Sequence, residues 1–107
     1  MITEIRVPRA TGGWSYEKFN RRAQDWAIVA AAVQLGDEPR VALVNMATTP
    51  VRSSAAEQAL ASGASAADAG AVAGEGMSPP EDLNGDAEYR THLASVLVER
   101  AITAAQT

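Results

Sequence analysis

The sequence contains no cysteine and a single histidine, His92. Disulfides, thiolate metal sites and cysteine nucleophiles are therefore excluded. Metal sites need several His, Cys or carboxylate side chains at set spacing. The sequence shows no such spacing, so we expect no bound metal. His92 has no partner base or nucleophile close to it in the sequence. We therefore expect no catalytic residue, and the chain alone is not predicted to be an enzyme.

Long apolar runs and a strong cationic balance are missing as well. No stretch reaches the roughly 18 apolar residues of a transmembrane helix, and the N-terminus lacks the basic-then-apolar pattern of a secretory signal. The absence of cysteine fits a reducing compartment, so we expect a cytoplasmic protein without a membrane partner. The net charge is −4: residues 1–52 carry seven Lys/Arg against five Asp/Glu, and residues 53–107 carry two against eight. This balance argues against nucleic acid as a partner.

The length of 107 residues predicts one domain, and its first half reads as strands. Residues 2–8 alternate in polarity, which is typical of a half-buried strand. Residues 26–33 form an unbroken apolar run, which suits a buried strand although a buried helix fits it too. We expect strands at about 2–8, 14–20, 26–35 and 40–47. Their short connections predict antiparallel pairing.

The second half predicts helices. Residues 55–73 contain ten alanines and the helix-breaking glycines Gly63 and Gly70. Ser53 or Ser54 can cap a first helix that ends at Gly63, and Ser65 can cap a second that ends near Gly74–Gly76. These signals favour helices at about 53–62 and 65–75 over an alanine-rich low-complexity segment. A final helix is expected at 86–105. Its predicted apolar face holds Tyr89, Leu93, Val96, Leu97 and Ala101, and its predicted solvent face holds Glu88, Arg90, Glu99 and Arg100. Strands followed by helices predict an α+β fold, with a three- to four-stranded antiparallel sheet and about three helices packed on one face.

A polar cluster between the aromatic strand and the apolar run holds more charge than a turn requires. Arg21 and Arg22 are followed three residues later by Asp25. A solvated loop with an exposed ion pair, worth ~0–1 kcal/mol, explains these residues in one way. Composition alone favours that interpretation, because functional charges are the minority class. In the other interpretation, Lys18 and the two arginines serve one anionic group, such as a nucleotide phosphate.

Four segments in order carry a family resemblance. They are Ile-Thr-Glu-Ile-Arg-Val-Pro (2–8), Tyr-Glu-Lys-Phe with Arg-Arg-x-x-Asp-Trp-Ala (16–27), Thr-Pro-Val-Arg (49–52), and Asp-Leu-Asn-Gly-Asp-Ala-Glu-Tyr-Arg-x-His-Leu-Ala-x-Val-Leu (82–97). Together they resemble the C-terminal domain of the FAD-binding (medium) flavoprotein subunit of aerobic carbon monoxide dehydrogenase and related xanthine dehydrogenase-type molybdenum hydroxylases. The resemblance runs from Ile2 to about Ala101. It implies the same small α+β sandwich.

The resemblance also implies a function and a site. Such a domain is non-catalytic, completes an FAD site and docks partners in electron transfer from iron–sulfur clusters to flavin. The positions that match the family near the flavin ring are Lys18, Arg21, Arg22, Asp25 and Trp26. The implied partners are the FAD-cradling domain and the iron–sulfur and molybdenum subunits. No glycine-rich nucleotide loop of the FAD-cradling part occurs here, so weak or no FAD binding by this chain alone is expected. The alternative is a free-standing homodimeric interaction domain without redox activity.

Overall fold

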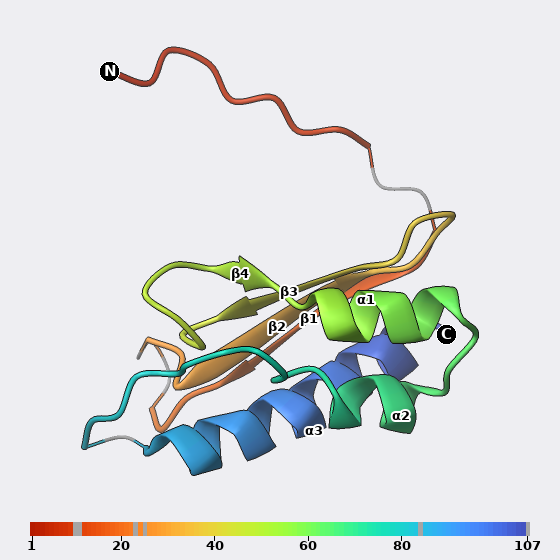
Figure 1. Cartoon of the computed structure of the whole chain (residues 1–107). Helices are drawn as coiled ribbons and strands as arrows, with labels where there is room; N and C mark the ends of the chain where they lie inside the picture. The colour runs from red at the N-terminus through yellow and green to blue at the C-terminus, as the bar shows by residue number, and fades with distance from the viewer. Residues whose placement is uncertain (10–11, 23, 25, 84, 107) are drawn as a thin grey trace.

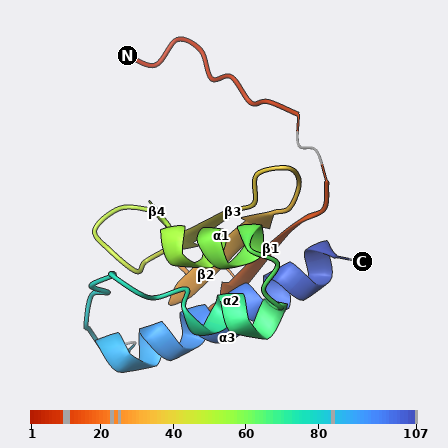
Figure 2. The same ribbon diagram turned by 45° about the vertical axis from the view of Figure 1, so that its right-hand side comes forward.

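A four-stranded antiparallel sheet covered by helices on one side forms the body of the protein. The computed structural model describes residues 1–9, 12–22, 24, 26–83 and 85–106. The strands are β1 (Trp14–Phe19), β2 (Val29–Gln34), β3 (Arg40–Val44) and β4 (Val51–Arg52), in the spatial order β1-β2-β3-β4. The helices α1 (Ser54–Ala61), α2 (Ala66–Ala71) and α3 (Ala87–Ala105) follow, and all three lie on the same side of the sheet (Figures 1 and 2). The predicted α+β class is confirmed.

The strand register gives the sheet two different faces. On the helix-covered face, Val29, Ala31 and Val33 of β2 lie beside Val41 and Leu43 of β3, and all five are buried. The other face carries no helix in the described part of the chain, and we call it the open sheet face. It consists of Trp14, Tyr16, Lys18, Ala30, Ala32, Gln34, Arg40, Ala42, Val44 and Arg52. Its centre is therefore made of alanines and its margins of aromatic and cationic side chains.

Helix α3 supplies the largest part of the helical layer. Its N-cap is Asp86, whose Oδ1 accepts a hydrogen bond from the Tyr89 N–H at 2.7 Å. Leu93 and Leu97 face the sheet with 8% and 3% exposure. None of the helices in the described ranges is both long enough and apolar enough to span a membrane.

Helix α2 lies close against α3 because of a glycine. Gly70 is a helix-breaking residue type, but it lies inside α2 and is buried. A Cβ built on Gly70 would stand 2.7 Å from the Ser95 carbonyl oxygen, so a larger residue would force the two helices apart. The glycine therefore permits the close approach, and α2 ends at Ala71 and continues as turns to Gly76 rather than as a helix to residue 75.

The predicted strands need several corrections. The strand expected at 2–8 is wrong: residues 1–9 form no strand and extend away from the body (Figure 1), with Ile2, Ile5 and Val7 between 77% and 83% exposed. Alternating polarity predicts a strand only where a neighbouring strand supplies hydrogen bonds, and none of the described strands lies beside this segment. The strand expected at 40–47 is β3, which ends at Val44. The fourth strand of the sheet, Val51–Arg52, pairs with Leu43 and Ala42 and was not predicted. The strand expected at 26–35 begins only at Val29.

Candidate functional site at one end of the sheet

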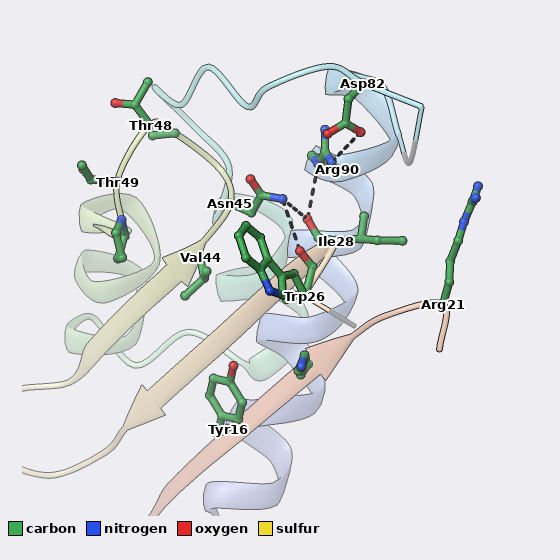
Figure 3. Close-up of a pocket in the computed structure, with 14 residues that line it drawn as sticks. Tyr16, Arg21, Trp26, Ile28, Val44, Asn45, Thr48, Thr49, Asp82 and Arg90 are labelled. Atoms are coloured by element: carbon green, nitrogen blue, oxygen red, sulfur yellow. Dashed lines mark hydrogen bonds and ion pairs between the residues drawn. The ribbon is translucent and has the colours of Figure 1, made fainter. Parts of the chain in front are cut away.

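One end of the sheet holds a pocket of about 830 Å³, which we call the sheet-end pocket (Figure 3). Because the strands are antiparallel, this end collects the end of β1, the start of β2, the end of β3 and the loop into β4. The loop before α3 and the first turns of α3 close one side. The lining residues are Tyr16, Lys18, Arg21, Trp26, Ala27, Ile28, Val44, Asn45, Ala47, Thr48, Thr49, Pro50, Asp82 and Arg90.

Three of the five site residues expected from the sequence line this pocket. They are Lys18 near the end of β1, and Arg21 and Trp26 in the loop between β1 and β2. Trp26 is 93% exposed, which is unusual for a tryptophan, and Arg21 extends away from the other labelled side chains in Figure 3. Arg22 is exposed and is not among the lining residues. Asp25 lies outside the described residues.

Arg90 fixes the wall of the pocket. The sequence analysis placed it on the solvent face of the final helix, but its side chain is 1% exposed. Its Nε donates to the Ile28 carbonyl at 3.3 Å, and Nη2 donates to Asp82 Oδ1 at 3.0 Å. Its Nη1 donates to the carbonyls of Gly85, at 3.0 Å, and of Pro80. One guanidinium thus holds α3, the start of β2 and the loop before α3 together.

Asn45 fixes the same part of the wall from the β3 side. Its φ is +66°, in the left-handed region that asparagine tolerates better than other non-glycine residues. This conformation follows directly after β3 and turns the chain, while Nδ2 donates to the carbonyls of Ala27 at 3.2 Å and Ile28 at 3.1 Å. Arg90 and Asn45 therefore bind the same stretch of main chain, just before β2, from two sides (Figure 3).

Sequence reasoning missed both of these residues. An arginine on a helix is expected to face solvent, because a buried arginine needs a polar partner for each of its donors. The partner that joins α3 to the sheet is the Ile28 carbonyl, 62 residues away along the chain, which no local pattern reveals. A signal was present for Asn45, since an asparagine at the end of a strand is a turn residue.

A second charged group anchors α1 rather than the pocket. Arg52 pairs with Glu57 through two contacts, Nε–Oε1 at 2.8 Å and Nη2–Oε2 at 2.9 Å, and the Val41 N–H donates to Glu57 Oε1 at 3.0 Å. Burial alone would raise the pKa of Glu57, but the hydrogen bonds from Arg52 and Val41 outweigh it and hold this pKa below its ordinary value of 4.5. The hydrogen bond to Glu57 raises the pKa of Arg52.

The chemistry of the sheet-end pocket is that of a binding surface. Tyr16 and Trp26 offer aromatic rings, and neither Lys18 nor Arg21 forms an ion pair within the described residues. The described part of the chain holds no group of three or more His, Cys, Asp or Glu residues suited to a metal ion. Aromatic rings beside cations suit a planar ligand that carries negative charge.

Comparison with known proteins identifies the fold. The model of the CO dehydrogenase flavoprotein C-terminal domain matches residues 14–105. The chain belongs to this family. The carbon monoxide dehydrogenase medium chain of Hydrogenophaga pseudoflava is 38% identical over 117 residues, covering 98% of this chain and 41% of that one. Caffeine dehydrogenase subunit beta of Pseudomonas sp. (strain CBB1) is 35% identical, with 98% and 40% covered.

Solved structures of the family share the architecture. The cyanide-inactivated Cu,Mo-CO dehydrogenase superposes with a TM-score of 0.76 at 36% identity, over 94% of this chain and 38% of that one. Quinoline 2-oxidoreductase from Pseudomonas putida 86 gives a TM-score of 0.80 at 25% identity, over 94% and 39%. The chain spans about two fifths of the length of the curated relatives it matches.

Proposed function

We propose that this chain is the non-catalytic C-terminal domain of a molybdenum-hydroxylase flavoprotein subunit, and that the sheet-end pocket completes an FAD site. The observation that supports this most is the family match over residues 14–105 together with the meeting of Lys18, Arg21 and Trp26 in one pocket. In the assembled enzyme the domain docks on the FAD-cradling part of the subunit. Iron–sulfur and molybdenum subunits then deliver electrons to the flavin, and the choice of substrate belongs to the molybdenum subunit.

The residues present fit one part of FAD. A pocket of about 830 Å³ lies within the range of ~300–1,000 Å³ typical of small-molecule sites. Its aromatic rings, Tyr16 and Trp26, suit the flat flavin ring. Within the described residues the lining contains no glycine-rich turn, and from α3 it contains Arg90 but not the N-terminal residues 86–89; glycine-rich turns and helix N-termini are the elements that hold a dinucleotide pyrophosphate. Another domain must therefore hold that group.

Each lining residue has a distinct task in this proposal. When bound, FAD supplies the ring that accepts and passes on electrons. Trp26 and Tyr16 exclude water from one side of the ring, and Lys18 and Arg21 place positive charge where the cofactor carries negative charge. Asn45 and Arg90 hold the main chain at Ala27 and Ile28, directly after Trp26, and so position the ring.

The chain alone is expected to bind FAD weakly or not at all. Exposed charges such as Lys18 and Arg21 contribute under ~1 kcal/mol each, whereas micromolar affinity requires ~8 kcal/mol. The purified chain should be colourless. Adding the chain to a solution of FAD should leave the flavin fluorescence nearly unchanged. Saturable binding of FAD in the low micromolar range that disappears in Lys18→Ala would contradict the conclusion that this chain supplies only part of the FAD site.

The test of the flavin role uses a complete subunit. This chain is fused in place of the C-terminal domain of the Hydrogenophaga pseudoflava medium chain, and FAD retention is measured by dilution and gel filtration. The double variant Lys18→Ala/Arg21→Ala should weaken FAD binding by about 5- to 30-fold, which corresponds to ~1–2 kcal/mol. Arg22→Ala is the matched control, since Arg22 is the adjacent exposed arginine outside the pocket lining. Equal losses in both variants, or no loss in either, would refute the assignment.

A further inference from the structure

We propose that the open sheet face is the surface through which this domain docks on the rest of the flavoprotein subunit, and that the partner presents an apolar centre with carboxylates around it. This inference rests on the proposed function. The helices cover one face of the sheet only (Figures 1 and 2). On the other, Trp14 is 69% and Tyr16 54% exposed, which leaves large apolar surfaces in water.

The shape of the open sheet face suits a protruding side chain of the partner. Ala32 and Ala42 are directly opposite one another and form the floor of a hollow of about 390 Å³. Trp14 and Tyr16 stand on one side of this hollow, and Arg40 and Arg52 stand on the other. Aromatic residues and arginine are the types that dominate the binding energy of protein interfaces.

The open sheet face is continuous with the sheet-end pocket. Tyr16 lines both the hollow and the pocket, and Lys18 and Val44 belong to the face while lining the pocket. A partner seated on the face would therefore also close the pocket from that side. This arrangement is expected of a site that two domains share, because the ligand then lies at their boundary.

Charge decides whether this face binds a second copy of the chain or the rest of the flavoprotein subunit. The face carries three cations, Lys18, Arg40 and Arg52, and none of its ten residues is Asp or Glu. Glu57 holds Arg52 in a two-contact pair, whereas the carboxylate of Glu38 lies 3.9 Å from Arg40. A second copy of this chain presents no carboxylate among its own ten face residues, so it does not complement these cations, and this disfavours a homodimer through this face. A partner with carboxylates is matched, and the relatives carry three fifths of their length outside the part that corresponds to this chain.

The test measures access to the face by thiol labelling. Because the chain has no cysteine, single-cysteine variants report one position each. Ala42→Cys places a thiol on the floor of the hollow, and Gln58→Cys places the control thiol on the exposed side of α1. Labelling is compared between the isolated chain and the fused subunit described above. The thiol at position 42 should react about tenfold more slowly in the subunit, while the control thiol reacts equally in both, because only an interface core excludes the reagent.

A charge reversal then tests the partner's chemistry. Arg40→Glu should restore labelling at position 42 in the subunit, whereas Arg100→Glu, the same change on the exposed side of α3, should not. Arg40 lies outside the sheet-end pocket, so its effect does not come from the flavin contacts. Protection that persists while FAD is lost would refute the flavin proposal and support the docking surface. FAD retained without protection would refute the docking surface and leave the flavin proposal standing.

Other outcomes overturn the docking surface as well. Protection of position 42 in the isolated chain that grows with chain concentration would show that a second copy covers the face. Protection that survives Arg40→Glu would refute the acidic partner. A fused subunit that aggregates while the isolated chain remains folded also counts against the proposal, because docking is expected to cover Trp14 and Tyr16.

Discussion

Replacing Arg90 by lysine is the sharpest test of how the sheet-end pocket is built. The side chain is 1% exposed and donates to three main-chain carbonyls and to Asp82. Lysine keeps the charge, but its compact ammonium group cannot span acceptors that surround a planar guanidinium. Some acceptors lose their donor, and a buried charge stays incompletely paired. Such a loss costs ~3–5 kcal/mol.

This cost is large beside the stability of a chain of this size. A domain of about 100 residues has ~5–15 kcal/mol in total, and 1 kcal/mol shifts its melting temperature by ~4–8 °C. Arg90→Lys should therefore lower the melting temperature by at least ~12 °C, measured by circular dichroism. Arg100→Lys is the matched control on the exposed side of the same helix, and it should change the free energy of unfolding by no more than ~0.5 kcal/mol.

The hydrogen bonds of Arg90 also predict where the damage appears. Amide hydrogen exchange should accelerate first in the loop before α3 and at the start of β2, because these segments share the guanidinium. A melting temperature within ~3 °C of the parent chain would refute the conclusion that this side chain holds the pocket wall. Acceleration spread evenly over the chain would show that Arg90 stabilises the fold as a whole and not this end of it.

Three further predictions concern the packing and the charges of the helical layer. Leu97→Ala should cost ~2–5 kcal/mol in a denaturant titration, because Leu97 is buried against the sheet; a cost under ~1 kcal/mol would contradict its placement. Gly70→Ala should lower the melting temperature although alanine is the better helix former, because its Cβ would meet the Ser95 carbonyl of α3; a raised melting temperature would refute the close approach. The folded-state pKa of Glu57 lies below 4.5, so its contribution to stability is fully present above that pH and is lost as the pH falls through the lower folded-state value. Glu57→Gln should therefore show a smaller difference in melting temperature between about pH 7 and about pH 3 than the parent chain does; an equal difference would refute the role of the pair with Arg52.

The sequence predicted what depends on local pattern and short connections. The caps at Ser53, Ser65 and Asp86 are all observed, since capping is a property of adjacent residues. The strand expected at 2–8 failed because alternation specifies a face but not a partner. The same limit explains β4, whose two residues form a strand only because Leu43 and Ala42 lie beside them.

The candidate site was predictable only in its exposed part. The charge of Lys18 and Arg21 drew attention in the sequence, whereas Trp26 was expected at the site only because of the family resemblance. Arg90 and Asn45 act through carbonyls distant in sequence, so their roles follow from the packing of α3 on β2 and not from any neighbouring residue. The open sheet face could not be predicted from the sequence either. Its alanines resemble ordinary strand residues, and only the strand register shows that they lie on one face.

The partners of Arg90 have a consequence for how this region tolerates mutation. Three of its four acceptors are main-chain oxygens, at Ile28, Pro80 and Gly85. Every amino acid supplies a carbonyl oxygen. The hydrogen bonds of the guanidinium therefore depend on where the backbone runs and not on which side chains it carries. Saturation mutagenesis should accordingly accept many residues at position 80 while rejecting nearly all at position 90. The loop could then diverge in sequence among related proteins and keep one shape, provided that the arginine stays.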